Sequence, residues 1–413
     1  MTDRTVLVSG AGIAGPSAAH WLHRAGYRVT VVESAPALRP GGQAVDFRGE
    51  QVKLLAAMGV LDEIRRYETA MGDQTVLGLD GRPALTVPGA AWSGEVEILR
   101  GDLARILYEH TAAHTEYVFG DRVTSLTETA DGVEVTFRHG PPRKFDLVVG
   151  ADGVHSGVRA AAFGPERDFR RDLGFGIAGF TAPNHLGLDH TSIMYNEPGR
   201  GLMVGSHRLP DRLHVSLVFA ADGVEFHRRG LAEQQALIAQ LFADTGWETP
   251  KLLEALPAAD DLYVDSISQI HLDRWAKGRV VLLGDAAWCA GPGGSGTGLA
   301  MMGAQVLAGE LAAAGGDHVT AFAKYEQRLR KPAAVGQKNG KGSGNFLAPR
   351  TAAKIRSRNR AYKMISTRLF GSIFTWMTDR AANALEYRAY PALGSPRGTR
   401  PAAGEELRGS RRG

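Results

Sequence analysis

The first 35 positions carry apolar residues at two different spacings. The runs "RTVLVSG" (4–10) and "YRVTVVES" (27–34) are short and rich in valine, which is typical of strands. Between them, over 16–25, apolar residues recur three or four positions apart, which predicts a helix. A strand, a glycine turn, a helix and a second strand in this order predict a βαβ unit.

Helical and strand-like spacings continue to alternate beyond this unit, and from 174 to 221 they give way to strands broken by turns, typical of an antiparallel sheet. The dense apolar run in "GRVVLLGDAA" (278–287) indicates a buried parallel strand, with which the chain returns to its first domain. Beyond 312 the pattern is mostly helical. The other predicted elements are helices over 51–58, 102–114 and 231–244 and strands near 122–126, 133–138, 145–150 and 262–270.

Length and composition are those of a soluble globular protein with more than one core. The chain has 413 residues, of which 44% are hydrophobic and 22% charged. The one cysteine, Cys289, excludes an internal disulfide, and the first strand begins too early to leave room for a signal peptide. Since no apolar run approaches the roughly 20 residues that span a bilayer, we expect a cytoplasmic protein without stable membrane insertion.

The formal net charge of +4 is unevenly distributed. Residues 350–413 contain 14 Lys and Arg against 4 Asp and Glu, whereas the rest of the chain contains 34 against 40. A body that is slightly acidic argues against a nucleic-acid partner. Over 350–385 apolar residues alternate with basic ones at helical spacing, which fits a helix that packs on its own protein or one that lies on an anionic membrane surface.

Three glycines, Gly10, Gly12 and Gly15, form a GxGxxG pattern between the first strand and the first helix. In this position the first makes a tight turn, the second lets the backbone approach a pyrophosphate and the third lets the helix lie close to the strand. Glu33, at the end of the next strand, would accept hydrogen bonds from the ribose hydroxyls of an adenosine. Its carboxylate would repel a 2′-phosphate, so the pattern favours FAD or NAD over NADP. The alternative is a glycine turn that serves packing alone, with Glu33 merely solvated.

Two distant stretches decide between these cofactors. In "GRVVLLGDAAWCAGPGGSGTGLA" (278–300), Gly284 and Asp285 end a buried strand, where a carboxylate can hold a ribityl hydroxyl of FAD. The following glycines lead into a helix whose N-terminal N–H groups could face the flavin pyrimidine. The alternative is a helix-capping Asp285 followed by an ordinary loop. The second stretch is "DLVVGADGVHSGVR" (146–159), which follows another predicted strand.

Taken in chain order, the N-terminal glycine turn, the stretch 146–159 and the stretch 278–300 resemble the class A flavoprotein aromatic monooxygenases. This is the p-hydroxybenzoate hydroxylase superfamily, which includes tetracycline-inactivating enzymes and polyketide hydroxylases. The resemblance spans roughly 5–330. It implies an α/β fold in which a Rossmann-like FAD-binding domain is interleaved with an antiparallel-sheet substrate domain and followed by a C-terminal helical region. The corresponding segments are 1–70, 96–173 and 271–330 for the FAD-binding domain, 71–95 and 174–270 for the substrate domain, 331–393 for the helices and 394–413 for a disordered tail.

The resemblance assigns roles to further residues. Asp152 and Gly153 match a motif that lies near the FAD pyrophosphate and is implicated in pyridine-nucleotide binding; Arg159 closes it, and Arg100 matches an arginine that reaches the cofactor. Ser156 does not fit the hydrolase nucleophile elbow, because it is the fourth residue of "GVHSG". The complete expected FAD set is Gly10, Gly12, Gly15, Glu33, Arg39, Arg100, Asp152, Gly153, Gly284, Asp285, Pro292, Gly294, Gly296, Thr297 and Gly298.

The chain departs from the family pattern at several positions. Ser34 stands where relatives have an arginine against the adenine, and Arg39 is a possible substitute. Trp288 replaces a histidine, Gly291 a proline and Gly298 an asparagine. The last three lie where the isoalloxazine is expected, so FAD binding is the firmer expectation and the redox step the less firm one.

The activity implied by the resemblance is a single-component hydroxylase. NADPH or NADH, bound transiently, would reduce FAD, and a hydroperoxyflavin would deliver oxygen to an aromatic or polyketide-like substrate. An alternative, motivated by the altered loop at Trp288, is an FAD protein that cyclises or rearranges its substrate without oxygenation. A third class, an NAD-dependent dehydrogenase, is disfavoured by Asp285 and its surroundings.

Substrate contacts are expected from the sheet over 174–221 and from "GGQAVDFRG" (41–49). No essential acid–base residue can be identified from the sequence, so the catalytic residues are left open, and no metal site is predicted. The substrate, the choice between NADH and NADPH and the oligomeric state are not set by the sequence. Candidate substrate-binding residues are Asp46, Arg48, Met194, His207 and Arg208, for each of which a solvated or core role is the alternative.

Overall fold

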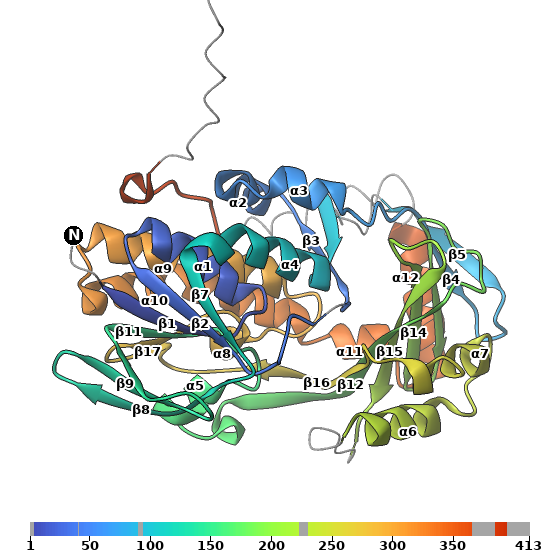
Figure 1. The fold of residues 1–413 in the computed structure, drawn as a ribbon. Coiled ribbons are helices and arrows are strands. Elements are labelled where there is room, and N and C mark those ends of the chain that lie inside the picture. The colour runs from blue at the N-terminus through green and yellow to red at the C-terminus, as the bar shows by residue number, and fades with distance from the viewer. Residues whose placement is uncertain (1–3, 40, 90–93, 223–229, 366–384, 395–413) are drawn as a thin grey trace, which may run out of the picture.

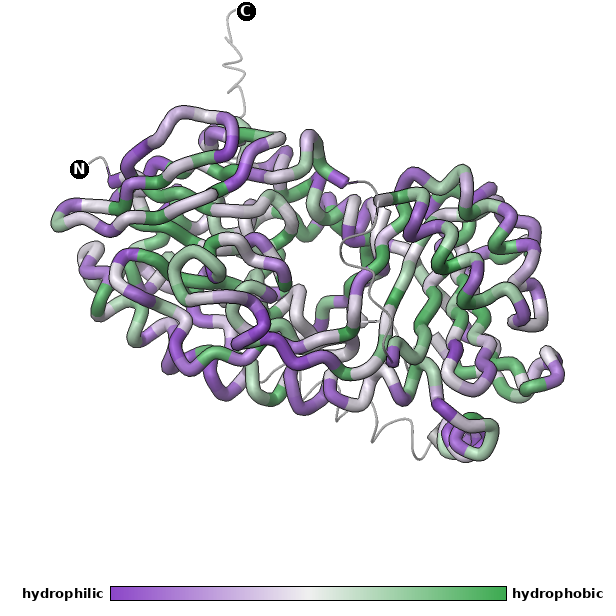
Figure 2. Tube along the Cα trace, turned by 90° about the horizontal axis from the view of Figure 1, so that it is seen from below, coloured by the Kyte–Doolittle hydropathy of each residue, from purple (hydrophilic) through white to green (hydrophobic). Residues whose placement is uncertain are grey.

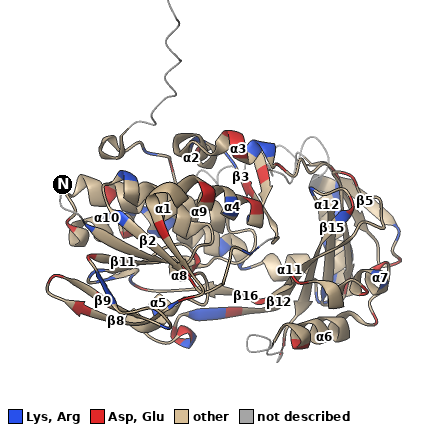
Figure 3. Cartoon of the chain, in the orientation of Figure 1, with Lys and Arg blue, Asp and Glu red and all other residues tan. Residues whose placement is uncertain are grey.

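The computed structural model describes residues 4–39, 41–89, 94–222, 230–365 and 385–394. They form two parts, each built on its own sheet, and the long strands β12 (Arg170–Pro183) and β16 (Tyr263–Ile270) run between the parts (Figure 1). Hydrophobic stretches lie within both parts (Figure 2), and residues of opposite charge are interspersed along both (Figure 3).

The first part is built on a six-stranded sheet in the order β17-β18-β11-β1-β2-β7. Five strands are parallel and β17 is antiparallel to β18. Strands β11 and β18 consist entirely of buried residues, as expected for parallel strands covered on both faces. The strands are β1 (Thr5–Ser9), β2 (Arg28–Glu33), β7 (Thr115–Phe119), β11 (Leu147–Gly150), β17 (Ala276–Lys277) and β18 (Val280–Leu282).

Helices cover one face of this sheet and a second, smaller sheet lies at the other (Figure 1). The covering helices are α1 (Ala14–Arg24), α4 (Arg100–Thr111), α9 (Gly296–Ala313) and α10 (His318–Gly340). The smaller sheet consists of β8 (Val123–Thr129), β9 (Gly132–Phe137) and β10 (Arg143–Phe145), with α5 (Gly157–Ala162) packed beside it. The pair β3 (Ala44–Phe47) and β6 (Val96–Leu99) and the helices α2 (Glu50–Met58), α3 (Leu61–Arg66) and α8 (Asp285–Trp288) complete this part.

The second part is built on a seven-stranded sheet in the order β16-β12-β15-β14-β13-β4-β5. Neighbours are antiparallel except for β4 and β13. The remaining strands are β4 (Gln74–Leu77), β5 (Pro83–Val87), β13 (Ser192–Glu197), β14 (Arg200–Ser206) and β15 (Arg212–Ala220). The helices α6 (Leu231–Phe242) and α7 (Thr249–Leu253) pack on one face, and α11 (Ser343–Leu347) and α12 (Ala352–Ile365) on the other. The expected α/β fold with parallel and antiparallel sheets and C-terminal helices is therefore confirmed.

Alternation along β15 separates the two faces of this sheet. Leu213, Val215 and Leu217 are buried in the core that α6 and α7 cover. His214 and Ser216 point to the opposite face, because successive side chains of a strand alternate. The sheet thus presents polar groups on the face turned away from α6 and α7.

Some element limits differ from those predicted. The strand expected over 145–150 is interrupted at Asp146, because the chain leaves the antiparallel pair β9–β10 there and joins β1; the Asp146 carboxylate accepts a hydrogen bond from the Thr5 N–H (2.7 Å). The helix expected over 102–114 runs from Arg100 to Thr111 and ends in a 3₁₀ turn (Ala112–His114).

Of the helix expected over 350–385, the structure describes α12 (Ala352–Ile365), and 366–384 lie outside the described residues, as does the predicted tail beyond Gly394. Tyr362, an apolar position of that helix, is buried against the second sheet, which fits packing on the protein itself. In the part of the chain that the structure describes, no helix has the length and apolarity needed to cross a membrane.

Four histidines line the contact between α1 and α4. The rings of His23 and His114 stack with centroids 4.1 Å apart, and those of His20 and His110 are 5.1 Å apart. His20 is 7% exposed, and its Nε2 atom is buried without a hydrogen-bond partner. Burial, with smaller contributions from His110 and Arg24, lowers the pKa of His20 to about 3. The His20 imidazole is therefore neutral in the folded protein.

This cluster predicts loss of stability in mild acid. The unfolded chain binds a proton at His20 below about pH 6.5 and the folded chain does not, so the free energy of unfolding falls by about 2 kcal/mol from this residue alone between pH 8 and pH 5. Urea unfolding of the wild type and His20→Leu at both pH values measures the difference, and the leucine variant should lose about 2 kcal/mol less. The exposed His139→Gln should behave as the wild type. An equal acid dependence in His20→Leu would contradict the assignment.

Candidate active site

The three glycines of the first turn occupy three different environments. Gly10 has φ +105°, and a Cβ there would lie 2.6 Å from the carbonyl oxygen of Ala151. A Cβ on Gly15 would lie 1.8 Å from the carbonyl oxygen of Gly10. A Cβ on Gly12 would meet nothing within 4 Å. Gly10 and Gly15 are thus required by the protein's own packing, whereas Gly12 borders open space, as a backbone that receives a pyrophosphate must.

Glu33 is fixed beside this turn by backbone donors. One carboxylate oxygen accepts a hydrogen bond from the Ala11 N–H (2.8 Å), and the other accepts from the Ala35 N–H (2.8 Å) and from the Ser34 hydroxyl (3.0 Å). Ser34, where the chain departs from its relatives, therefore orients the acid that was expected to bind ribose. Arg39 is exposed, and its role toward the adenine stays a prediction.

The Asp152 carboxylate holds the turn of the second motif (146–159) together through hydrogen bonds. Its carboxylate accepts hydrogen bonds from the Ser9 hydroxyl (3.3 Å), the Val158 N–H (3.1 Å) and the Ser156 hydroxyl. Ser156 in turn caps α5, so it has a structural function in place of a nucleophilic one. Gly153 has φ +79° and open space at its Cβ position, as Gly12 has. The turn thus leaves a second open backbone position near Gly10.

Arg159 joins this motif to the third one. Its side chain is fully buried and donates to the carbonyl oxygens of Val154 (2.6 Å) and Ala286 (3.1 Å) and to the Glu166 carboxylate (3.0 Å). Ala286 directly follows Asp285 at the start of α8. Arg159 therefore holds the expected pyrophosphate and ribityl sites together and does not face a ligand itself.

Gly284 and Asp285 lie at the end of β18, as predicted. Gly284 has φ +65°, and a Cβ there would lie 3.1 Å from the Ala300 Cβ. Burial raises the pKa of Asp285, while the Arg100 cation and a hydrogen bond from Cys289 oppose that rise. Arg100 at the start of α4 is thus brought within electrostatic reach of Asp285, from which it is separated by 185 positions in the chain.

Asp285→Ala is expected to lower the affinity for FAD by about 10- to 100-fold, because a hydrogen bond to a charged group contributes about 1.5–3 kcal/mol. Apoprotein unfolding should change little, since the variant removes a carboxylate that burial already disfavours. Titration of apoprotein with FAD, followed by flavin fluorescence, measures the affinity, with the exposed Asp273→Ala as the control. Unchanged FAD affinity in Asp285→Ala would refute its role.

The loop after α8 explains two departures from the family pattern. Trp288 is 1% exposed and packs against Trp275 and Tyr325, with ring centroids 4.5 and 6.1 Å away. The expectation that this replacement borders the isoalloxazine is wrong, because the indole lies in the core. Gly291 has φ +78°, a conformation closed to the proline of relatives, whose ring fixes φ near −65°.

The first turn of α9 contributes the last expected cofactor residues. Its N–H groups at Gly296, Thr297 and Gly298 have no acceptor within the helix, as at any helix N-terminus. A Cβ on Gly296 would lie 3.5 Å from the Asp285 carboxylate, and one on Gly298 would lie 2.3 Å from the Gln51 side chain. A side chain at position 298 would therefore displace the end of the flexible Gln51 side chain. Pro292 and Thr297 are half-buried on the same loop and turn.

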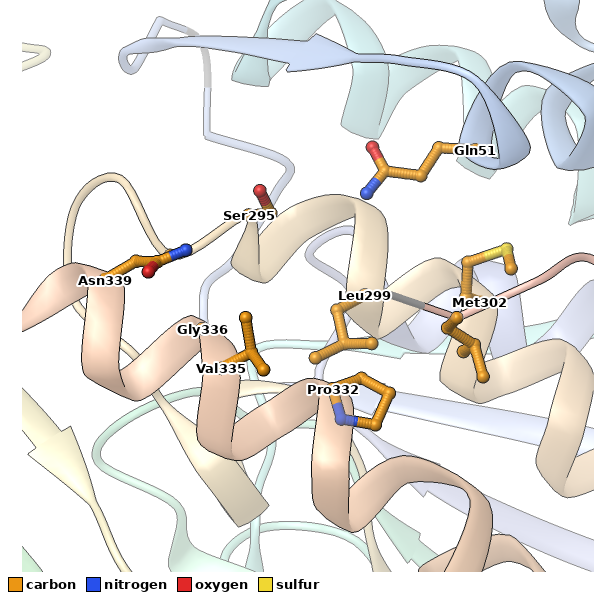
Figure 4. A pocket seen from close by; sticks show the side chains of 10 residues that line it. Gln51, Ser295, Leu299, Met302, Pro332, Val335, Gly336 and Asn339 are labelled. Carbon is orange, nitrogen blue, oxygen red and sulfur yellow. The ribbon is translucent and has the colours of Figure 1, made fainter. Parts of the chain in front are cut away.

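A small pocket lies behind this turn, between α9, α10 and α2 (Figure 4). Gln51 and Ser295 approach it from α2 and from the loop before α9, and Leu299, Pro332 and Val335 supply its apolar wall (Figure 4). A Cβ on Gly294, also at the pocket, would lie 2.4 Å from the Ala290 Cβ. Glycine is thus required where the loop folds back on itself.

The five predicted substrate residues have different surroundings. Asp46 and Arg48 form an ion pair (3.3 Å) at the end of β3. Met194 is 1% exposed and belongs to the core under α12, so the core alternative describes it. Arg208 lies against Asp102 of α4 (3.6 Å), and the neighbouring His207 is half-buried and accepts a hydrogen bond from Leu209 within its own turn. Contact of Asp46, Arg48, His207 and Arg208 with a substrate stays a prediction.

Sequence reasoning missed several polar residues of the second sheet. On β15, His214 shares a hydrogen bond with Ser216 (3.2 Å), and burial lowers the pKa of His214 to about 4. On β16, Tyr263 and Asp265 lie within electrostatic reach of Asp285. The only signal for them was the polar half of the alternation in "LHVSLVF" and "LYVDSIS", which does not say which face is covered.

Comparison with known proteins identifies the family. The model of the FAD-binding domain family matches residues 3–334. An uncharacterized protein of Mycobacterium tuberculosis is 42% identical over 329 residues, 78% of this chain and 88% of the relative. A flavin-dependent monooxygenase of Legionella longbeachae is 34% identical over 367 residues, 87% of this chain and 94% of the relative.

Solved structures agree with this result. The crystal structure of the tetracycline destructase Tet(51) has a TM-score of 0.81 at 32% identity and covers 94% of this chain and 99% of its own. Klebsiella pneumoniae HpxO, complexed with FAD and uric acid, has a TM-score of 0.73 at 22% identity, with coverage of 92% and 97%, and supports the fold. The chain therefore belongs to the FAD-binding domain family and is an FAD-dependent oxidoreductase of the class A flavin-dependent monooxygenases.

Proposed function

We propose that this protein is a single-component hydroxylase that uses NADPH or NADH and dioxygen to oxygenate an aromatic or polyketide-like small molecule. One observation carries the proposal: the open backbone at Gly12 and Gly153, the Asp285 carboxylate and the polar face of the second sheet adjoin one another. This arrangement offers a site for FAD and a surface for a second ligand beside it.

The residues fit FAD in position and in chemistry. Glu33, fixed by backbone N–H groups, would take the ribose hydroxyls, and the backbone at Gly12 would take the pyrophosphate. Asp285 would bind the ribityl chain, and the free N–H groups that begin α9 would face the flavin pyrimidine and favour its reduced, anionic form. When bound, FAD supplies the acceptance of reducing equivalents from NAD(P)H and the activation of dioxygen.

The second sheet contributes the substrate side. His214 is neutral at physiological pH because burial lowers its pKa to about 4, so it can donate or accept a hydrogen bond without carrying charge. Gly179 and Gly205 lie on the same face, at registers beside Ser216 and His214, so no Cβ projects from the sheet at these two positions. A flat, largely uncharged ligand suits such a surface. Since Trp288 lies in the core, no observation favours the non-oxygenating alternative that it motivated.

The experiment combines spectroscopy with isotope labelling. We expect the purified protein to be yellow or to become so with FAD, and NADPH or NADH to bleach the flavin band without oxygen. With tetracycline as the first probe, chosen because of the Tet(51) likeness, and with other polycyclic aromatics, ¹⁸O₂ should label the product. A protein that binds no FAD would refute the proposal. A flavin that neither nicotinamide reduces, with or without these probes, would favour the cyclising or rearranging alternative.

A further inference from the structure

A second polar pocket lies at the end of the six-stranded sheet where the parallel strands begin. Four of its lining residues directly precede four neighbouring strands, in the spatial order Arg279 before β18, Asp146 before β11, Arg4 before β1 and Tyr27 before β2. The residues expected to bind FAD instead follow the carboxyl ends of β1, β2, β11 and β18 or lie beyond them. Because these strands are parallel, the pocket and the FAD motifs lie at opposite ends of the sheet.

The two arginines are held in this pocket by backbone carbonyls. Arg4 donates from a terminal nitrogen to the carbonyl oxygen of Gly315 (2.8 Å). Arg279 donates to the carbonyl oxygens of Asp146 (3.4 Å) and Ala130 (3.1 Å). Neither guanidinium forms an ion pair with any residue that the structure describes, and each has further N–H donors to offer. Both cations are therefore positioned without being neutralised.

The connection from α9 to α10 supplies the rest of the polar lining, Gly316 and His318. Gly316 has φ +85°, and a Cβ there would lie 1.0 Å from a terminal nitrogen of Arg4, so the guanidinium rests directly on this backbone. Burial, and next the Arg279 cation, lower the pKa of His318, so its imidazole is neutral at physiological pH and has one N–H to donate.

The hydroxyl of Tyr27 is an unsatisfied polar group at the buried side of the pocket. The side chain is 4% exposed, and its hydroxyl makes no hydrogen bond within the described part of the chain. Burial raises the pKa of Tyr27, against the opposing effect of the nearby Arg4 cation, so the phenol keeps its proton. Since buried polar groups almost always have a partner, this donor calls for a ligand atom or a water.

Asp146 restricts the anions that such a pocket can take. One oxygen of its carboxylate accepts hydrogen bonds from the N–H (2.7 Å) and the hydroxyl (3.0 Å) of Thr5. A carboxylate can only accept, so it repels an anion without a proton and accepts a hydrogen bond from an anion that carries an O–H group. Glu128 and Asp317 act electrostatically on His318 but do not line the pocket. The lining itself thus carries two positive charges against one negative charge.

We propose that this pocket binds a phosphate that carries an O–H donor, either hydrogen phosphate itself or the monoester of a polyol. Arg4 and Arg279 would bind the charged oxygens, His318 and Tyr27 would each donate a hydrogen bond, and Asp146 would accept one from the O–H group. This inference does not rest on the proposed function, because the pocket is separated from the FAD motifs by the length of the strands.

Calorimetric titration of the FAD-loaded protein at about pH 8 and constant ionic strength tests the proposal. FAD fills the other expected phosphate site. Hydrogen phosphate should bind at least about tenfold more tightly than sulfate, which has the same charge and a similar shape but no proton for Asp146, because this is the effect of one hydrogen bond to a charged group. Glycerol phosphate distinguishes the two sources: tighter binding than that of the free ion identifies a polyol monoester, and weaker binding identifies free phosphate.

Variants of the lining locate the binding. Arg4→Gln and Arg279→Gln should each weaken phosphate binding by at least about tenfold, through the loss of a hydrogen bond between charged groups. Arg167→Gln is the control, because that side chain is 84% exposed and lies outside the pocket, and it should bind phosphate as the wild type does. Tyr27→Phe removes a hydroxyl without a protein partner, so it should fold normally and still lose about fivefold in phosphate affinity. Retained flavin absorption shows that each variant is folded.

Asp146→Asn tests the discrimination between the two anions. The asparagine oxygen can still accept from the Thr5 N–H, but the amide can donate to sulfate, so the preference for phosphate should disappear. Kosmotropic anions also stabilise proteins without a site, and that effect would be the same for phosphate and sulfate in every variant. Such uniform behaviour, absence of phosphate binding, or equal losses in the Arg4, Arg279 and Arg167 variants would overturn the proposal, whether or not NAD(P)H reduces the flavin.

Discussion

Gly15→Ala is expected to unfold at a markedly lower denaturant concentration than the wild type and to lose FAD binding. Alanine favours a helix over glycine by about 1 kcal/mol, and position 15 lies in α1, so propensity alone predicts stabilisation. The added Cβ, however, would lie 1.8 Å from the Gly10 carbonyl oxygen, a backbone atom that has no rotamer by which to move away. Overpacking of this kind costs about 3 kcal/mol, so the net loss should be about 2 kcal/mol. Urea unfolding of the apoprotein measures it.

Gly12→Ala makes this prediction specific. The new methyl group would meet nothing within 4 Å, so the apoprotein should unfold within about 0.5 kcal/mol of the wild type. FAD affinity should nevertheless fall by at least about tenfold, because the methyl group occupies the space through which the backbone approaches the pyrophosphate. Two results would contradict the assignment: a Gly15→Ala apoprotein as stable as the wild type, or a Gly12→Ala protein that binds FAD normally.

Features that depend on neighbours close in the chain could be predicted from the sequence. The βαβ unit, the glycine turn and Glu33 were predictable because each depends on neighbours within about 25 positions. The apolar runs before Asp152 and Asp285 also predicted that each follows a buried strand, as the structure has them, after β11 and β18. The alternation of polar and apolar residues also predicted the antiparallel part of the second sheet.

The features that the sequence did not predict depend on contacts between distant segments. The alternation of polar and apolar residues along one strand carries no signal for such contacts. Strand β4 joins the second sheet beside β13, more than 100 positions later, and pairs with it in parallel. Whether Met194 faces a ligand or a helix depends on α12 covering that side of the sheet. Trp288 seemed to belong to the crevice because it follows Asp285 by three positions, yet α8 turns its indole into the core. Local patterns therefore predicted the glycine turn and the strand ends better than the packing of the second sheet.

Arg159→Met is expected to be among the most destabilising single substitutions in the first part of the molecule. The guanidinium is fully buried and holds two backbone carbonyls and Glu166, while its Nε atom has no partner. Methionine fills a similar volume but leaves the carbonyls of Val154 and Ala286 without these donors and Glu166 without this cation. A buried carbonyl that loses its donor costs about 1–3 kcal/mol, while Glu166, which is 27% exposed, keeps its contacts with His155 and Arg170, so unfolding of the apoprotein should show a loss of about 2–6 kcal/mol.

The same substitution should also weaken FAD binding, because Ala286 adjoins Asp285 and Val154 adjoins Gly153, so Arg159 fixes the distance between two cofactor motifs. Flavin fluorescence titration under conditions in which the variant is still folded separates this effect from unfolding. Arg167→Met is the control: that side chain is 84% exposed, its ion pair with Asp168 is long at 3.8 Å, and the loss should stay below about 0.5 kcal/mol. If both variants lost similar stability, Arg159 would contribute no more than a surface charge. If Arg159→Met lost stability but bound FAD normally, the hydrogen bonds of Arg159 to the two motifs would serve the fold alone.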